Sequence, residues 1–414
     1  LGIWVAPALI AIGYILLEFF TPAPVGSLLA STIWDASWNW ALTALPLFIW
    51  MGEILFRTRL SSDMFKGLSP MLSRLPGGLL HVNVVGCGIM AAVAGSSAVT
   101  CATIGRMSIP ELTKRKYDET LSIGSLAGSG TLGLLIPPSI MLIVYGVLAQ
   151  QSISRLFIAG VLPGIMIILI FMTYIAIRAK LNPSLAPKEK NNYTFLEKLI
   201  AGRHLFPVVG LIFCVLGSIY GGYATPTEAA TIGVCGALLL AWLTKTLNLK
   251  SFFDSLMGAV KTSCMINFII VGAAFLSVAM GYTGIPKQLG EIVNQYELSQ
   301  ISLLIILTIL YIFLGCFLEG TSMMVLTASV VLPMVQTAGI DLIWFGIYTV
   351  IVVEMAQITP PVGFNLFVLQ GMTGRNILKI TKAAMPFFFL MLLGIIILVI
   401  FPQIVTAPVQ YMIQ

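Results

Sequence analysis

Two short stretches of the sequence combine backbone and side-chain groups that bind ions. Each contains glycine and hydroxyl residues, in "AGSSAVT" (94–100) and "EGTSMMV" (319–325), and each is followed by a Pro-Pro pair, at 137–138 and 360–361. A proline inside a helix removes one backbone hydrogen bond and costs about 3 kcal/mol, so two in a row predict a broken helix. The carbonyl oxygens freed at a break and the nearby hydroxyls are suitable ligands for a hard cation.

The two stretches belong to an internal repeat. Four prolines recur with a spacing of 223 residues, which pairs Pro110 with Pro333, Pro137 with Pro360, Pro138 with Pro361 and Pro163 with Pro386. The glycine-hydroxyl motifs match with an offset of two residues. One Pro-Pro pair could be a kink repaired by neighbouring hydroxyls or waters. Two pairs in one register, each with its own motif, favour a functional break.

The composition indicates a protein that lies in a lipid bilayer. Of 414 residues, 58% are hydrophobic and 9% are charged, whereas soluble domains carry about 25% charged residues. Apolar stretches of the length that a bilayer requires recur along the chain. We therefore predict an all-α polytopic membrane protein without a sizeable soluble domain. The net charge of +6 lies in loops, so it does not indicate a nucleic-acid partner.

The basic residues predict the topology. We expect spans at 2–20, 41–56, 117–148, 154–179, 205–221, 228–245, 260–281, 342–371 and 384–404, and two re-entrant hairpins at 77–112 and 301–335. With a cytoplasmic N-terminus, this assignment places 19 of the 22 lysines and arginines on the cytoplasmic side, as the positive-inside rule requires. Without the hairpins this bias disappears.

The same assignment divides the chain into two halves. The polar stretch 180–204 is predicted to be a cytoplasmic linker between a first half, 1–179, and a second half, 205–414. Each half holds scaffold helices, one hairpin and one broken helix (117–148 or 342–371). With four spans in the first half and five in the second, the first hairpin enters from the cytoplasm and the second from outside, so the halves have opposite orientations and the C-terminus is periplasmic. This is the inverted-topology repeat of many secondary transporters, whose half-helix N-termini suit an anionic substrate.

Two charged residues inside the predicted spans are also candidates. Glu354 lies in the second broken helix, where an intramembrane carboxylate is a functional hypothesis that competes with simple solvation near the outer face. Arg106 follows the first hairpin tip, and we expect it to extend toward the cytoplasmic side rather than to bind substrate.

The motifs resemble the large membrane subunit of tripartite ATP-independent periplasmic (TRAP) transporters. The resemblance covers the whole chain and rests on "GSSAVTCATIG", "GTLGLLIPPSIMLIVYG", "LFIAGVLPG", "GGYATPTEAA", "GCFLEGTSMMVLTASVVLPM" and "ITPPVGFNLFV". It implies a sodium-driven importer of organic acids in the bacterial inner membrane, working by an elevator movement. It also implies a small four-helix membrane subunit and a periplasmic substrate-binding protein as partners. The chain departs from the pattern at Ala356, where glycine is expected, and at Glu319, where aspartate is expected.

The site residues follow from the motifs and the resemblance. Sodium, as the coupling ion rather than a prosthetic group, is expected where each tip meets a break. Its predicted ligands and neighbours are Gly95, Ser96, Gly133, Ile136 and Pro138 in the first half, and Gly315, Gly320, Ala356, Thr359 and Val362 in the second. The organic acid is expected to contact Ser96, Ser97, Ser139, Thr321, Ser322 and Asn365.

Two other functions were weighed against this interpretation. An intramembrane protease could use "GSSA" as a nucleophile loop, but the only histidines, His81 and His204, fall near the cytoplasmic edge, and H-E-x-x-H and paired-Asp motifs are absent. We therefore expect no enzymatic activity. A sodium-coupled elevator carrier that works without a binding protein is the nearer alternative. A requirement for an added periplasmic protein separates it from the main interpretation.

The topology can be tested with single cysteines. A cysteine at Lys190 or Arg375 is expected to react with an impermeant reagent only from the cytoplasmic side, and one within 284–296 only from outside. Labelling of the Lys190 position from outside would contradict the predicted orientation.

Overall fold

The structure, a computed structural model, describes residues 5–58, 60–187, 194–295, 299–360 and 363–411. Within these residues it consists of helices joined by short connections. The all-helical architecture agrees with the sequence-based prediction, because a helix satisfies its backbone hydrogen bonds within one segment and can therefore lie in lipid.

The first part of the chain forms nine α-helices within the described residues. They are α1 (Val5–Phe20), α2 (Val25–Ser37), α3 (Ala44–Phe56), α4 (Leu60–Leu72), α5 (Leu80–Ala94), α6 (Ser97–Lys114), α7 (Glu119–Gly130), α8 (Ile140–Leu148) and α9 (Ile153–Leu181). The 3₁₀ helices η1 (Trp40–Thr43) and η2 (Thr131–Leu134) precede α3 and follow α7. Several helices begin at capping side chains; Asp118, for example, accepts a 2.7 Å hydrogen bond from the Leu121 amide at the start of α7.

The remaining helices follow the linker region. They are α10 (Phe195–Gly202), α11 (Phe206–Tyr220), α12 (Pro226–Leu243), α13 (Leu249–Thr283), α14 (Ile285–Gln295), α15 (Gln300–Gly315), α16 (Gly320–Thr337), α17 (Leu342–Ala356), α18 (Phe364–Thr373), α19 (Ile377–Ile400) and α20 (Gln403–Tyr411). The breaks between α7 and α8 and between α17 and α18 occur where the Pro-Pro pairs predict them.

The spacing of 223 residues that relates the prolines also relates the helices. α6 and α16 begin and end at equivalent positions, and α7, α8 and α9 match α17, α18 and α19 to within a few residues. At the same spacing α1 matches α12 and α4 matches α14. The two-residue offset of the motifs does not appear in the helix bounds, so Ser96 and Glu319 are the equivalent N-cap residues.

The helix that contains the predicted span 260–281 is longer than that span. α13 is a continuous helix of 35 residues that begins at Leu249, whereas the equivalent positions of the first half form the bent pair α2 and α3, with an angle of 52°. The early start has a clear cause, because Asn248 accepts a 2.7 Å hydrogen bond from the Ser251 amide in a capping box. Lys250 on the added turns, together with Lys261 at the start of the predicted span, favoured a cytoplasmic loop before residue 260.

Other boundaries also differ from the prediction. The predicted linker is not only loop, because a capping box of Thr194 and Glu197 starts α10. The last predicted span, 384–404, begins earlier, with α19 starting at Ile377 after the Asn376 cap. The helices α2, α14 and α20 were not predicted, since they are short and flanked by polar or proline-containing stretches.

Helix length alone does not decide how the chain crosses the bilayer. Among the described residues, five helices are long and apolar enough to span a membrane, namely α9, α12, α13, α16 and α19. The number becomes seven if the bent pairs α2–α3 and α10–α11 each count as one span. α16 belongs to this group although the sequence predicts it as one arm of a hairpin. The re-entrant character of 77–112 and 301–335 therefore stays a prediction.

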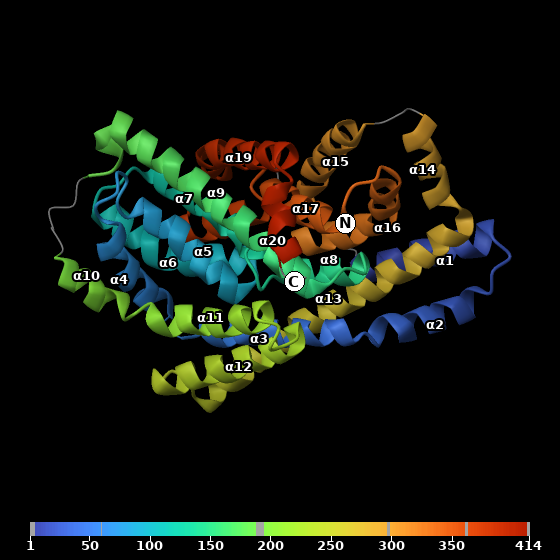
Figure 1. Cartoon of the computed structure of the whole chain (residues 1–414), viewed down its shortest axis with the longest axis horizontal. Helices are drawn as coiled ribbons and strands as arrows, with labels where there is room; N and C mark the ends of the chain where they lie inside the picture. The colour runs from blue at the N-terminus through green and yellow to red at the C-terminus, as the bar shows by residue number, and fades with distance from the viewer. Residues whose placement is uncertain (1–4, 59, 188–193, 296–298, 361–362, 412–414) are drawn as a thin grey trace.

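The helices that surround the site pack reciprocally across the two halves. α1 packs against α13, and the equivalent helix α12 packs against α3. We call α1, α2, α3, α11, α12 and α13 the frame; in Figure 1 they run along the lower and right side of the molecule. α4 and α14 lie at opposite ends of the long axis, where α4 packs on α5 and α14 on α16.

The inner helices, α5–α9 and α15–α20, also cross between the halves. α6 packs against α18, and its equivalent α16 packs against α8. In the same way α7 contacts α19, and α17 contacts α9. Each tip helix therefore meets the distal part of the broken helix from the other half, and this brings both tips and both breaks into one region.

The close crossing of α7 and α19 leads to a stability prediction. A methyl group on Gly124 would lie 2.2 Å from the Ala383 carbonyl oxygen, so Gly124→Ala must push α19 away. We expect a loss of about 1–3 kcal/mol, seen as a lower melting temperature of the purified protein. Gly210→Ala on α11 is the control, because nothing lies within 4 Å of that position and alanine favours a helix. Equal melting temperatures for Gly124→Ala and the unchanged chain would contradict the packing.

Candidate functional site

The first tip, Gly95–Ser97, lies directly on the first break, between α7 and α8. A methyl group on Gly133 would lie 2.6 Å from the Ser96 carbonyl oxygen and from the Ser97 Cα atom. Gly95 ends α5 with φ +56°, a conformation that favours glycine, and a methyl group on it would lie 3.3 Å from the Ile140 side chain and 3.4 Å from the Pro138 carbonyl oxygen. The structure thus brings together Gly95, Ser96, Gly133 and Pro138 of the predicted first ion site, while the Ile136 side chain lies near Gly88 and Gly164.

The second tip, Gly315–Ser322, packs on the second break, between α17 and α18. A methyl group on Gly315 would lie 2.3 Å from the Ala356 Cβ atom. The Gln357 side-chain amide donates a 3.3 Å hydrogen bond to the Leu318 carbonyl, and the Cys316 thiol lies 3.2 Å from the Pro360 carbonyl oxygen. This contact also agrees in position with the prediction, while the binding of an ion at either contact stays a prediction.

Each break contains a hydroxyl near its proline pair that bonds a backbone carbonyl. In the first, Ser139 donates to the Leu134 carbonyl and caps α8 by accepting from the Leu142 amide. In the second, Thr359 donates a 2.7 Å hydrogen bond to the Ala356 carbonyl. Side-chain hydroxyls therefore satisfy one backbone carbonyl at each break, as expected for a proline kink. At the second break this bond keeps the Thr359 and Ala356 oxygens adjacent, as they would be if both bound one cation.

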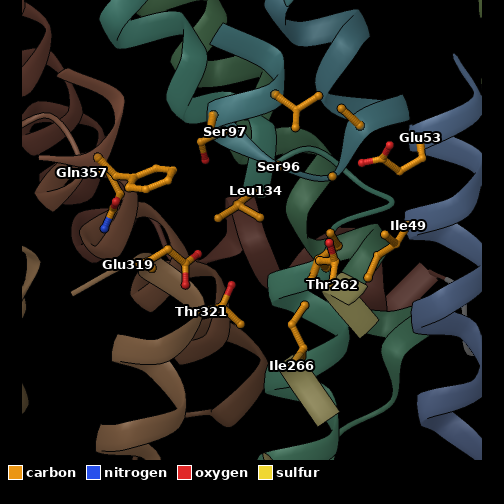
Figure 2. Close-up of a pocket in the computed structure, with 18 of the residues that line it drawn as sticks. Ile49, Glu53, Ser96, Ser97, Leu134, Thr262, Ile266, Glu319, Thr321 and Gln357 are labelled. Carbon is orange, nitrogen blue, oxygen red and sulfur yellow. The ribbon is translucent and has the colours of Figure 1, made fainter. Parts of the chain in front are cut away.

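A cavity of about 230 Å³ lies between the two tips and the frame. Figure 2 shows Ser96 and Ser97 of the first tip, Glu319 and Thr321 of the second, and Ile49 and Glu53 of α3 around it. α13 contributes Thr262, Met265 and Ile266. The second break contributes Gln357, and the start of α18 contributes Phe364 and Asn365. The cavity is therefore bounded by both halves, and by both the frame and the inner helices.

The charged groups of the cavity are acidic. Glu53 forms a 2.9 Å ion pair with Arg57, which is not among the lining residues. Glu319 accepts a 3.2 Å hydrogen bond from the Ser322 amide and so caps α16. No lysine, arginine or histidine is among the described lining residues. The remaining positive potential comes from the N-terminus of α6, whose Ser96 cap makes no side-chain capping bond.

The predicted site residues divide into two groups. Six line the cavity: Gly95, Ser96, Ser97, Gly320, Thr321 and Asn365. Gly133, Ile136, Pro138, Ser139, Gly315, Ser322, Ala356 and Thr359 are not among its lining residues, and Val362 lies outside the described residues. Ser139 is fully buried, and its hydroxyl holds the first break together instead of facing the cavity.

Sequence reasoning missed several lining residues. Glu53 is the acidic residue of the predicted span 41–56, and the rule that flagged Glu354 could have found it. Thr262 gave no signal, because a single threonine inside the predicted span 260–281 carries no charge and belongs to no motif. Arg106 does not line the cavity; its guanidinium lies 5.8 Å from the centre of the Phe56 ring.

Comparison with known proteins places the whole chain in one family. A family model described as "Tripartite ATP-independent periplasmic transporter, DctM component" matches residues 1–404. The C4-dicarboxylate TRAP transporter large permease protein DctM of Pseudomonas aeruginosa is 31% identical over 395 residues, covering 95% of this chain and 91% of that protein. The sialic acid TRAP transporter large permease protein SiaM of Vibrio cholerae is 27% identical, covering 88% and 85%.

Two further similarities concern chain length and fold. The isethionate TRAP transporter permease protein DctMQ of Oleidesulfovibrio alaskensis is 31% identical over 403 residues, and the match covers 63% of that longer protein. Among solved structures, the YdaH transporter of Alcanivorax borkumensis aligns with a TM-score of 0.66 over 95% of this chain and 96% of that one. At 13% sequence identity this similarity concerns the fold alone.

The Asn365 amide and the Ser139 hydroxyl lead to opposite stability predictions. Both polar atoms of the Asn365 side chain are buried without a hydrogen-bond partner among the described residues. Asn365→Leu removes them, so we expect a gain of about 1–3 kcal/mol in the absence of ligand. Ser139→Ala removes the bond that holds the first break and is expected to destabilise by a similar amount. Thermal unfolding measures both, and a loss of stability in Asn365→Leu would contradict the first expectation.

Proposed function

The chain belongs to the DctM family of tripartite ATP-independent periplasmic transporter components, and from that premise we propose that it is the multi-pass membrane subunit of a sodium-coupled importer of a small organic acid. The observation that carries this proposal is the cavity enclosed by both tips, the second break and the frame. In this cavity polar groups of both tips converge, one tip from each repeat, as groups do at the substrate sites of repeat transporters.

An anionic substrate suits the cavity. The relatives are named for C4-dicarboxylates, isethionate and sialic acid, all of them organic acids. The volume of about 230 Å³ lies just below the range of roughly 300–1,000 Å³ typical of ligand pockets, which favours a small solute. Ser96, Ser97 and Thr321 offer hydroxyls, Asn365 offers an unpaired amide, and the α6 N-terminus offers partial positive charge.

The charge of this site supports the proposal of sodium coupling. Of the two glutamates that line the cavity, Glu53 is paired with Arg57, and Glu319 forms no ion pair among the described residues. An acid would enter against the charge of Glu319 unless cations accompany it. We place one sodium ion at each contact of a tip with a break. Ala356 and Thr359 supply adjacent oxygens at the second, and the carbonyls around Gly133–Pro138 supply them at the first.

The partners are proposed from the family and the relatives. The family is described as tripartite, and DctMQ is a single protein of which this chain matches about two thirds. We therefore propose that a separate small membrane subunit, with four helices, packs beside this chain. A periplasmic binding protein is proposed to deliver the acid.

Alternating access is proposed as an elevator movement of the inner helices against the frame, in the bacterial inner membrane. The cavity wall supports this division, because Glu53 and Thr262 belong to the frame while the tips belong to the inner helices (Figure 2). The inverted orientation of the halves, with the N-terminus cytoplasmic, the linker 180–204 cytoplasmic and the C-terminus periplasmic, is part of the same proposal.

The function is tested by uptake into proteoliposomes that hold this chain and its small subunit. We expect accumulation of the binding protein's ligand only with that binding protein outside and an inward sodium gradient. Uptake without the binding protein would favour the alternative, a sodium-coupled elevator carrier that works alone. Uptake that ignores the sodium gradient would contradict the coupling.

The ion sites are tested by removing single hydroxyls. Thr359→Val keeps the shape of the side chain and deletes one oxygen, and Ser96→Ala does so at the first tip. Each is expected to raise the sodium concentration for half-maximal uptake on the order of tenfold, as a loss of about 1.4 kcal/mol implies. Thr337→Val, whose hydroxyl bonds the Pro333 carbonyl at the end of α16, is the matched control. Unchanged sodium dependence in both site variants would show that the breaks do not hold the ion.

A further inference from the structure

Glu354 is a buried acid without a counter-charge. Its side chain, on α17, is fully buried behind the cavity wall. Oε1 accepts a 2.5 Å hydrogen bond from the Ser97 hydroxyl, and Oε2 has no hydrogen-bond partner among the described residues. No ion pair in the described part of the chain includes Glu354. An ionised carboxylate offers about four acceptor positions, so this environment leaves it largely unsatisfied.

The groups around Glu354 do not supply positive charge. Glu319 at the second tip is the charged group that acts on it electrostatically, and it is also acidic. The tyrosines on the packed helices are bonded elsewhere: Tyr145 on α8 to the Leu342 carbonyl, Tyr311 on α15 to Thr327, and Tyr348 on α17 to the Leu304 carbonyl and Thr308. What remains is the partial positive charge of the α6 N-terminus, where Ser97 is the first helical residue.

The Glu354–Ser97 pair has no counterpart at the equivalent positions of the other half. At the spacing of 223 residues, Glu354 is equivalent to Thr131 and Ser97 is equivalent to Gly320. The Thr131 hydroxyl bonds the Gly128 carbonyl of its own helix, and Gly320 has no side chain. The crossing of α6 with the second half therefore joins a carboxylate to a hydroxyl, whereas the equivalent positions of the other crossing hold no carboxylate and one hydroxyl that is bonded within the first half.

We propose that Glu354 and Ser97 form a third cation site, which takes one small monovalent cation, a proton or a sodium ion, on the unpaired oxygen of Glu354. The cation neutralises the buried carboxylate and so allows the first tip to dock on α17. Because Ser97 also lines the cavity, the site joins the wall that would contact substrate to the second broken helix. The proposal deepens the proposed function, since it adds a coupling charge that the two symmetric break sites do not contain.

The test measures binding directly rather than uptake, so its outcome is independent of whether the transport proposal holds. Thermal unfolding of the purified full chain is followed in sodium chloride against choline chloride at constant pH, and over a pH series without sodium. A cation that binds only the folded state raises the melting temperature with its concentration. We expect Glu354→Gln, which carries no charge, to lose part of the sodium response or of the stabilisation seen at acidic pH.

The two responses identify the cation. If the occupant is sodium, the sodium-induced shift of Glu354→Gln is smaller than that of the unchanged chain at every pH. If it is a proton, the stability of the unchanged chain falls as pH rises, since the folded acid holds a proton that the unfolded one releases, and Glu354→Gln loses this fall. Sodium at the two breaks contributes equally to both proteins.

Matched variants keep the proposal falsifiable. Glu228→Gln removes an exposed capping carboxylate on α12 and is expected to retain both responses. Ser97→Ala is expected to weaken the response without abolishing it. If Glu354→Gln does not elute as a single folded species, Glu354→Asp keeps the charge and must keep a cation response. Responses of Glu354→Gln equal to those of Glu228→Gln, or no cation response in Glu354→Asp, would overturn the third site.

Discussion

A helix broken inside a membrane exposes backbone groups that lipid cannot satisfy, and in this chain both breaks are closed by a helix tip pressed against them. At the first break, the absence of a side chain on Gly133 allows the Ser96–Ser97 backbone to approach closely. At the second, the absence of a side chain on Gly315 allows the same for Ala356. The contacts are too close for a side chain on either glycine. The position of each tip is therefore tied to the conformation of its break.

This constraint explains why the halves must cross. A tip that seals the break of its own half leaves the rest of its helix free, and α6 and α16 use that surface to pack on α18 and α8 of the other half. Four segments far apart in the sequence then meet around one cavity (Figure 2). Movement of either tip must disturb both a break and the opposite half, which is a physical basis for linking the proposed ion sites to the proposed substrate site.

The sequence predicts the parts of this arrangement that depend on periodic or local signals. Repeated prolines located both breaks and the repeat, and glycines located both tips. The continuity of α13 was not predictable in this way, because its equivalent in the first half bends at Trp38–Trp40 without a proline to mark the bend. Nor could the sequence show that Ser139 bonds backbone while Ser97 reaches Glu354, 257 residues away. Those contacts depend on how the helices cross.

The departure at Ala356 shows why a position in such a contact cannot be judged alone. Glycine was expected there from the family pattern, and the equivalent residue of the first half is Gly133. In the second half the alanine methyl is accommodated because its neighbour across the contact, Gly315, has no side chain. The same close approach is thus achieved with the glycine on the broken helix in one half and on the helix leading to the tip in the other. The alanine therefore only changes which of the two contacting helices carries the glycine. The Ala356 carbonyl still accepts the hydrogen bond of the Thr359 hydroxyl, so the two candidate ion ligands stay adjacent.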